Sequence, residues 1–175
     1  YFSLEMSAHE LIAKSVSRQT YLLCGNDTRK AKTVRGITTK SRYAGYSADE
    51  RRLIDNAVLA YQKYAGRLYY YEGIGNIGAE EIRCQTEAHI RLTGRTPVVM
   101  IDYLQIMAPY DLRASDKQNM DKAVLELKRL SRDCKLPVIA ISSLNRDSYH
   151  SGEIEMNAFK ESGAIRSDIY EIRGF

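Results

Sequence analysis

Two carboxylates directly follow short apolar runs: Glu5 comes after residues 2–4, and Asp102 after residues 98–101. A carboxylate at the carboxyl end of a buried parallel strand is the arrangement that holds Mg²⁺ beside nucleotide phosphates. A second one could polarise a water molecule for attack on a γ-phosphate. Each acid also has a plainer interpretation. Asp102 could cap a loop, and Glu5 could be a surface residue beside a helix start, where negative charge is favourable.

A glycine-rich segment offers different phosphate chemistry. Residues 73–78 match G-x-G-x-x-G, follow a strand-like run and precede a helix-like run. Asp102 stands about where a ribose-binding acid would lie in a dinucleotide fold, so an NAD-binding enzyme is one alternative. Against it, two expected helices and a strand precede this loop, whereas the fingerprint usually occupies the first strand of its unit. The motif G-x-x-x-x-G-K-[ST] is absent, because no glycine in the chain is followed by lysine.

Alternating strands and helices must position these residues. Capping-box patterns at Ser7 and Ser47 predict helices that run to about Leu23 and to Gly66. Apolar spacing predicts two further helices, over about 79–92 and 119–134. The expected strands are 1–6 (an edge strand), 68–71, 97–104, 137–142 and 165–172. This order predicts an α/β sandwich with a mainly parallel sheet. Residues 145–157 are polar and turn-prone, which indicates a mobile loop.

Composition sets the class of protein. Of 175 residues, 44% are hydrophobic and 27% charged, which is typical of one globular domain. No apolar run approaches the ~20 residues that cross a bilayer, and the first residues do not resemble a signal peptide. The chain opens inside a strand-like run, so we expect a fragment. Its three scattered cysteines favour reduced thiols in a cytoplasmic protein without a zinc site.

The net charge of +4 has a local origin. Six basic residues and no acid lie between Arg29 and Arg42. We interpret this stretch as a loop. It is either a solvated segment or a surface that meets nucleic acid or a neighbouring acidic subunit.

Four segments together resemble the DnaB helicase family. Residues 2–6 (FSLEM) resemble the family's strand after its phosphate-loop helix, and residues 99–107 (VMIDYLQIM) its Walker B segment. Residues 136–146 (LPVIAISSLNR) resemble its third helicase motif, and residues 159–165 (FKESGAI) its DNA-contacting loop. The Walker B segment is the most specific match. The resemblance covers nearly all of the chain and is weakest over 24–44 and after residue 166.

The resemblance implies roles for individual residues. Glu5 matches the catalytic glutamate that activates water, and Asp102 the acid that organises Mg²⁺ through water. Ser143 stands at the γ-phosphate-sensing position. The implied DNA-binding residues, which hold the backbone of single-stranded DNA, are Arg146, Lys160, Glu161 and Gly163. ATP and Mg²⁺ are the implied cofactors. A homohexameric ring is the implied assembly, a primase and a helicase loader are candidate partners, and no membrane is involved.

The implied fold is a RecA-like three-layer sandwich, incomplete at both ends. We expect residues 1–175 to be a single partial ATPase domain, with Walker A upstream and the arginine-finger segment downstream, and the fragment alone to be inactive. Ser143 replaces the family's usual glutamine, and Lys160 its usual arginine. The function implied is an ATP-dependent replicative DNA helicase. The alternatives are a recombinase or phage-type ATPase, a non-catalytic DNA-binding or assembly module of the same fold, and the NAD enzyme.

Overall fold

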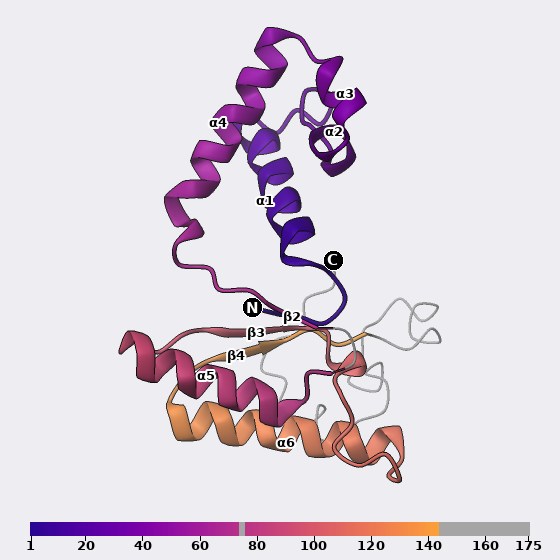
Figure 1. The fold of residues 1–175 in the computed structure, drawn as a ribbon, viewed down its shortest axis with the longest axis vertical. Helices are drawn as coiled ribbons and strands as arrows, with labels where there is room; N and C mark the ends of the chain where they lie inside the picture. Colours follow the sequence, from indigo (N-terminus) through magenta and orange to yellow (C-terminus); the bar gives the residue numbers. More distant parts are fainter. Residues whose placement is uncertain (74–75, 144–175) are drawn as a thin grey trace. The chain divides into compact units, whose positions relative to one another are not determined.

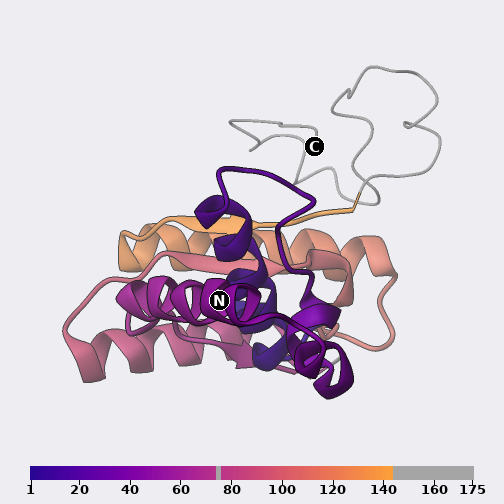
Figure 2. The same ribbon diagram turned by 90° about the horizontal axis from the view of Figure 1, so that it is seen from above.

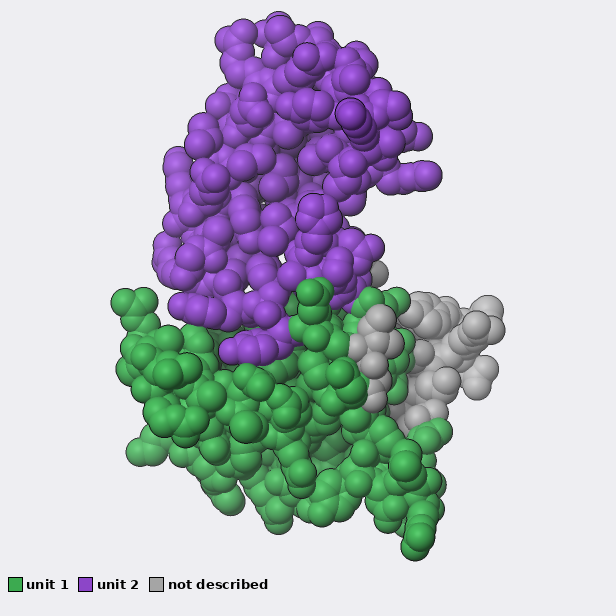
Figure 3. All heavy atoms as spheres, viewed as in Figure 1, with its two compact units in different colours: residues 1–5, 72–175 green, residues 6–71 purple. Residues whose placement is uncertain are grey.

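The computed structural model describes residues 1–73 and 76–143. Its contacts divide the chain into two compact units (Figure 3). Unit 1 comprises Tyr1–Glu5 and Glu72–Phe175, and unit 2 comprises Met6–Tyr71. The predicted loop over 145–157 and the predicted strand over 165–172 lie outside the described residues.

A mainly parallel sheet is the framework of unit 1. Its strands are β1 (Phe2–Ser3), β2 (Tyr71–Glu72), β3 (Val99–Asp102) and β4 (Val138–Ala140). Their order is β2-β1-β3-β4, and β1 and β4 both run parallel to β3. The predicted α/β class is confirmed. The prediction that Glu5 follows an edge strand is wrong, because β1 lies between β2 and β3.

Two helices, α5 (Ala79–Thr93) and α6 (Asp116–Cys134), lie together on one face of this sheet (Figures 1 and 2). Ile82 of α5, Ile101 of β3 and Leu130 of α6 are fully buried, so the core of unit 1 lies between the helices and the sheet. Gly94 is the C-cap of α5 and adopts the left-handed conformation. A short 3₁₀ helix, η1 (Leu104–Ile106), follows β3.

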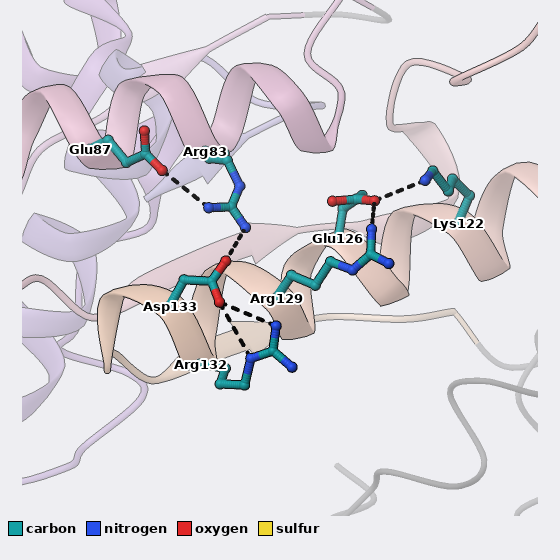
Figure 4. Close-up of polar contacts among 7 residues, drawn as sticks. All are labelled: Arg83, Glu87, Lys122, Glu126, Arg129, Arg132 and Asp133. Carbon is teal, nitrogen blue, oxygen red and sulfur yellow. Dashed lines mark hydrogen bonds and ion pairs between the residues drawn. The ribbon is translucent and has the colours of Figure 1, made fainter.

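Ion pairs join the outer surfaces of α5 and α6 (Figure 4). Arg83 of α5 contacts Glu87 on its own helix and Asp133 on α6, both at 3.1 Å. Within α6, Glu126 pairs with Lys122 and Arg129. These side chains are partly exposed to solvent, so each pair contributes little stability by itself. Arg83 links the two helices at their solvent side.

Unit 2 is helical: α1 (Ala8–Leu23), α2 (Val34–Thr38), α3 (Lys40–Ala44) and α4 (Ala48–Ala65). Val16 of α1 packs with Ala57 and Tyr61 of α4, and this cluster is its core. Both predicted capping boxes are present: Ser7 with Glu10, and Ser47 with Glu50. Leu23, however, is 49% exposed, so the apolar face of α1 stops before the helix does.

Several sequence expectations need correction. The stretch from Arg29 to Arg42 is not simply a loop, because it contains α2 and the start of α3. The strand expected over 68–71 starts only at Tyr71. Helix α6 begins three residues earlier than expected, at a capping box formed by Ser115 and Gln118. Strand β4 is not fully buried: Ile139 is 47% exposed, because β4 ends the strand order among the described residues.

Candidate nucleotide site

The carboxyl ends of β1, β3 and β4 meet at one edge of the sheet. In register, Ser3 aligns with Asp102, and Ile101 aligns with Ala140. Glu5 follows β1 by two residues, and Ser143 follows β4 by three. Three residues that the sequence singled out therefore lie beyond the same edge, from three neighbouring parallel strands. Open α/β sheets bind their ligands at this edge.

Asp102 is held by two residues that flank the neighbouring strand β1. The Tyr1 hydroxyl donates a 2.6 Å hydrogen bond to its Oδ2, and the Leu4 N–H donates to its carbonyl oxygen at 2.9 Å. The carboxylate is half-buried, whereas the Glu5 side chain is exposed. Strand geometry explains the Tyr1 contact, because residues two apart along neighbouring strands share a face. Tyr1 could not be assigned from the sequence, because only the strand register reveals its partner.

Gln105 fixes the segment that carries Ser143. Its Oε1 accepts from the Ser143 N–H at 3.1 Å, and its Nε2 donates to the Ser142 Oγ at 2.8 Å and to the Ser143 carbonyl at 3.3 Å. Both backbone polar groups of Ser143 thus bond to one side chain. Gln105 was not among the residues predicted for the site. Its signal was a polar residue inside the apolar run after Asp102.

The donor set at this edge fits Mg²⁺ in one particular mode. Mg²⁺ keeps several waters in nucleotide sites and is held by one or two carboxylates together with substrate phosphates. Asp102 supplies one such carboxylate, already oriented by Tyr1. Within residues 1–73 and 76–143, no group of three or more His, Cys, Asp or Glu could hold a metal by itself. The single oriented carboxylate of Asp102 is of the kind that can hold a metal bound together with a nucleotide.

The glycine-rich segment has the context that its motif requires but not the topology. It follows β2, and Gly78 is the N-cap of α5. In a dinucleotide fold, the strand before the loop and the strand with the acid are neighbours. Here β1 lies between β2 and β3, so the strand that bears Asp102 is not beside the strand before the loop. This order disfavours the NAD interpretation.

The remaining residues of the expected site lie outside the described part of the chain. They are Arg146, Lys160, Glu161 and Gly163. Their assignment to DNA stays a prediction. No helix in residues 1–73 and 76–143 has both the length and the apolar character to span a membrane.

Known proteins are similar to this sequence. It matches the family described as DnaB-like helicase C terminal domain over residues 1–170. The replicative DNA helicase DnaB of Leifsonia xyli subsp. xyli is 28% identical over 170 residues, which cover 96% of this chain and 33% of that protein. DnaB of Haemophilus influenzae is 28% identical over 173 residues, 95% of this chain and 33% of the relative. The chain thus spans about a third of the length of these curated relatives.

Solved structures share the fold. A DnaB-like replicative helicase, described together with its interactions with primase, superposes with a TM-score of 0.75 at 20% identity. The superposition covers 95% of this chain and 37% of that one. A second structure, described as an ATPase domain, also gives 0.75 at 20% identity, covering 95% of this chain and 54% of that one. These structures confirm the predicted RecA-like class. Because the family match extends over residues 1–170, the chain belongs to the DnaB-like helicase C-terminal domain family.

Proposed function

We propose that the complete protein is an ATP-dependent replicative DNA helicase and that this chain is part of its motor domain. The observation that carries the proposal is the placement of Glu5, Asp102 and Ser143 beyond one edge of three neighbouring parallel strands. A phosphate-hydrolysing site needs a base, a metal-organising acid and a group that senses the phosphate, and these residues are of the required types.

Each residue has one task in this proposal. Asp102 would hold Mg²⁺ through water, and the Tyr1 hydroxyl keeps its carboxylate in one orientation. Glu5 is exposed and accepts a proton from the attacking water. When bound with ATP, Mg²⁺ neutralises the negative charge that develops on the β- and γ-phosphates. Gln105 bonds to Ser143 and lies in the segment after β3. A displacement of Ser143 is therefore transmitted to that segment.

The DNA-facing part of the proposal depends on the family resemblance. Lys160, Glu161, Gly163 and Arg146 are proposed to hold the backbone of single-stranded DNA, which a translocating motor must grip without reading bases. A homohexameric ring and a primase partner are proposed on the same ground. A related solved helicase is described with its interactions with primase, which supports that partner class.

The test is a Glu5→Gln substitution in the full-length protein, with ATP turnover and nucleotide binding measured together. We expect hydrolysis to fall about 10²–10⁴-fold, because a general base is lost, while nucleotide affinity stays within a few-fold. Glu80→Gln is the matched control, since Glu80 is an exposed carboxylate in the first turn of α5. Near-normal turnover in Glu5→Gln would reject Glu5 as the base. A wild-type protein without any turnover would favour the non-catalytic module.

A further inference from the structure

Positive charge is concentrated in unit 2. Residues 6–71 contain 12 Lys and Arg but only 5 Asp and Glu. The rest of the chain holds the remaining 14 basic and 17 acidic residues, so its net charge is negative. A compact helical unit with a net charge of +7 attracts polyanions.

The few acids of unit 2 are already neutralised where the charge is densest. Asp27 pairs with Arg29 at 3.1 Å, Asp49 with Arg52 at 3.0 Å, and Glu50 with Lys32 at 2.5 Å. Between residues 29 and 42, four exposed cations have no ion pair within the described residues. They are Lys30, Arg35, Lys40 and Arg42. Their charge is therefore available to an external anion.

An exposed polar run, residues 38–42, carries two of these cations. Thr38, Thr39, Lys40, Ser41 and Arg42 are all exposed, and Thr39 is the cap shared by α2 and α3. Hydroxyl, lysine and arginine side chains are the groups that contact phosphate oxygens in protein–DNA complexes. We call Lys30, Arg35 and the run from 38 to 42 the α2–α3 surface.

The helices beneath this surface are anchored. Arg51 of α4 donates to the Ala44 carbonyl at 2.6 Å and lies 5.9 Å from the centre of the Tyr43 ring. Lys32 lies 4.8 Å from the Tyr46 ring centre, and its side chain is 10% exposed. Helix α2 contacts α1 and α3 (Figure 1). The cations therefore project from a fixed platform.

We propose that the α2–α3 surface binds the phosphate backbone of duplex DNA without reading its sequence. An acidic protein partner fits less well, because protein interfaces have apolar or aromatic centres depleted of charge, and residues 38–42 contain no such residue. Single strands are usually gripped by aromatic side chains that stack on bases. The nearest rings, Tyr43 and Tyr46, are half-buried, pack edge-to-face and carry cations. Duplex DNA instead offers the densest line of phosphates.

This contact goes beyond the proposed function. It uses residues of unit 2 alone and none from the nucleotide site or from 146–163. The duplex ahead of a replication fork is chemically the kind of substrate that such a surface would hold. It would add an electrostatic grip that does not depend on ATP.

The experiment uses the full-length protein, no nucleotide, and a blunt duplex without single-stranded tails. Binding is measured over a range of salt concentrations for wild type and for Lys40→Ala with Arg42→Ala. We expect the variant to bind duplexes of unrelated sequence more weakly than wild type does, and by a similar factor for each sequence. The slope of log K against log salt should become shallower by about two, one for each lost phosphate contact.

Two variants keep the result interpretable. Lys63→Ala with Arg67→Ala removes the same charge from unit 2, at the far end of the 18-residue α4, which is about 27 Å long. We expect this control pair to change duplex affinity little. Lys40→Arg with Arg42→Lys keeps both charges and should keep binding. If both double-alanine variants lose the same amount of duplex affinity, binding follows net charge alone and the proposal is overturned.

Three further outcomes would also overturn it. They are unchanged duplex affinity, loss confined to particular sequences, and a selective loss of single-strand binding. ATP turnover stimulated by single-stranded DNA should persist in Lys40→Ala with Arg42→Ala, which also shows that the variant is folded. An inactive Glu5→Gln enzyme that still binds duplex would leave this proposal standing. A variant that loses duplex binding but hydrolyses ATP normally would support both proposals.

Discussion

Ser143 is held in place through its backbone, so its side chain can be substituted without loss of that anchor. The Gln105 side chain bonds to both the N–H and the carbonyl of Ser143. It also holds the Ser142 hydroxyl, so the segment after β4 is tied to the segment after β3. The exposed Ser143 side chain takes no part in that anchoring. A substitution there should therefore alter what the residue reaches without moving the strand end.

Ser143→Gln in the full-length protein tests this reasoning. A glutamine reaches about two heavy atoms farther than serine and could contact a γ-phosphate directly, whereas serine would need a bridging water, which controls geometry less well. We expect greater stimulation of ATP turnover by single-stranded DNA, with the basal rate within a few-fold of wild type. The measurement is a paired titration of both proteins with single-stranded DNA.

Gln105→Ala is the companion variant, because it removes the backbone anchor and leaves Ser143 in place. It should lower DNA stimulation in either background. Equal stimulation of wild type and Ser143→Gln would mean that coupling runs through other residues.

At the scale of elements, long periodic helices could be predicted and short ones could not. The patterns at Ser7 and Ser47 predicted α1 and α4, because a capping box is a local signal within four residues. Helices α2 and α3 have five residues each, too few to show an apolar period. They depend on the Thr33 cap of α2 and on the contact from Arg51 to Ala44 of α3, and both Thr33 and Arg51 lie outside these helices.

The site shows the same division between local and non-local signals. Glu5 and Asp102 could be found because an acid after an apolar run is visible in the sequence. Tyr1 and Gln105 could not be assigned, because their partners are 101 and 37–38 residues away. Only the pairing of β1, β3 and β4 brings those partners together.

The missed capping box of α6 gives a prediction about stability. The Ser115 hydroxyl oxygen accepts from the Gln118 N–H at 3.3 Å, and the Gln118 Oε1 accepts from the Ser115 N–H at 3.0 Å. Ser115→Ala should lower the free energy of unfolding by about 1 kcal/mol, because a helix-start N–H loses its partner. Urea unfolding followed by circular dichroism measures this change. Ser41→Ala, at an exposed position in α3, should change it by less than about 0.5 kcal/mol. Equal midpoints for both variants would contradict the capping role.

At the scale of the whole molecule, charge has a pattern that composition conceals. The net charge of +4 suggests mild basicity, and the stretch from Arg29 to Arg42 accounts for it arithmetically. Only the boundaries of unit 2 reveal that residues 6–71 carry +7, while the rest of the chain is acidic. Those boundaries come from tertiary contacts, so the sequence alone could not assign the basic character to a folded unit.

Acid sensitivity should follow from the carboxylates of both units. Five of them have a pKa below its ordinary value: Glu10, Asp27, Glu50, Glu126 and Asp133. For Glu10 the largest cause is the hydrogen bond from the Ser7 backbone N–H; for the other four it is a hydrogen bond from a lysine or arginine side chain. A lowered pKa means that folding favours the charged carboxylate. The stability it contributes is therefore complete above the ordinary values of 3.8 and 4.5, and disappears as pH falls through the lower folded-state values.

The melting temperature of the chain should accordingly change little, as far as these groups are concerned, between pH 7 and pH 6, and fall between about pH 5 and pH 3. Thermal unfolding followed by circular dichroism at low ionic strength measures the curve. In about 1 M salt the fall should be smaller, because four of the five carboxylates act through exposed or partly exposed ion pairs that salt screens. Glu50→Gln should flatten the curve further, since it removes the partner of Lys32, whose side chain is largely buried. A melting temperature that stays level or rises toward pH 3 would show that the paired carboxylates do not stabilise the folded state.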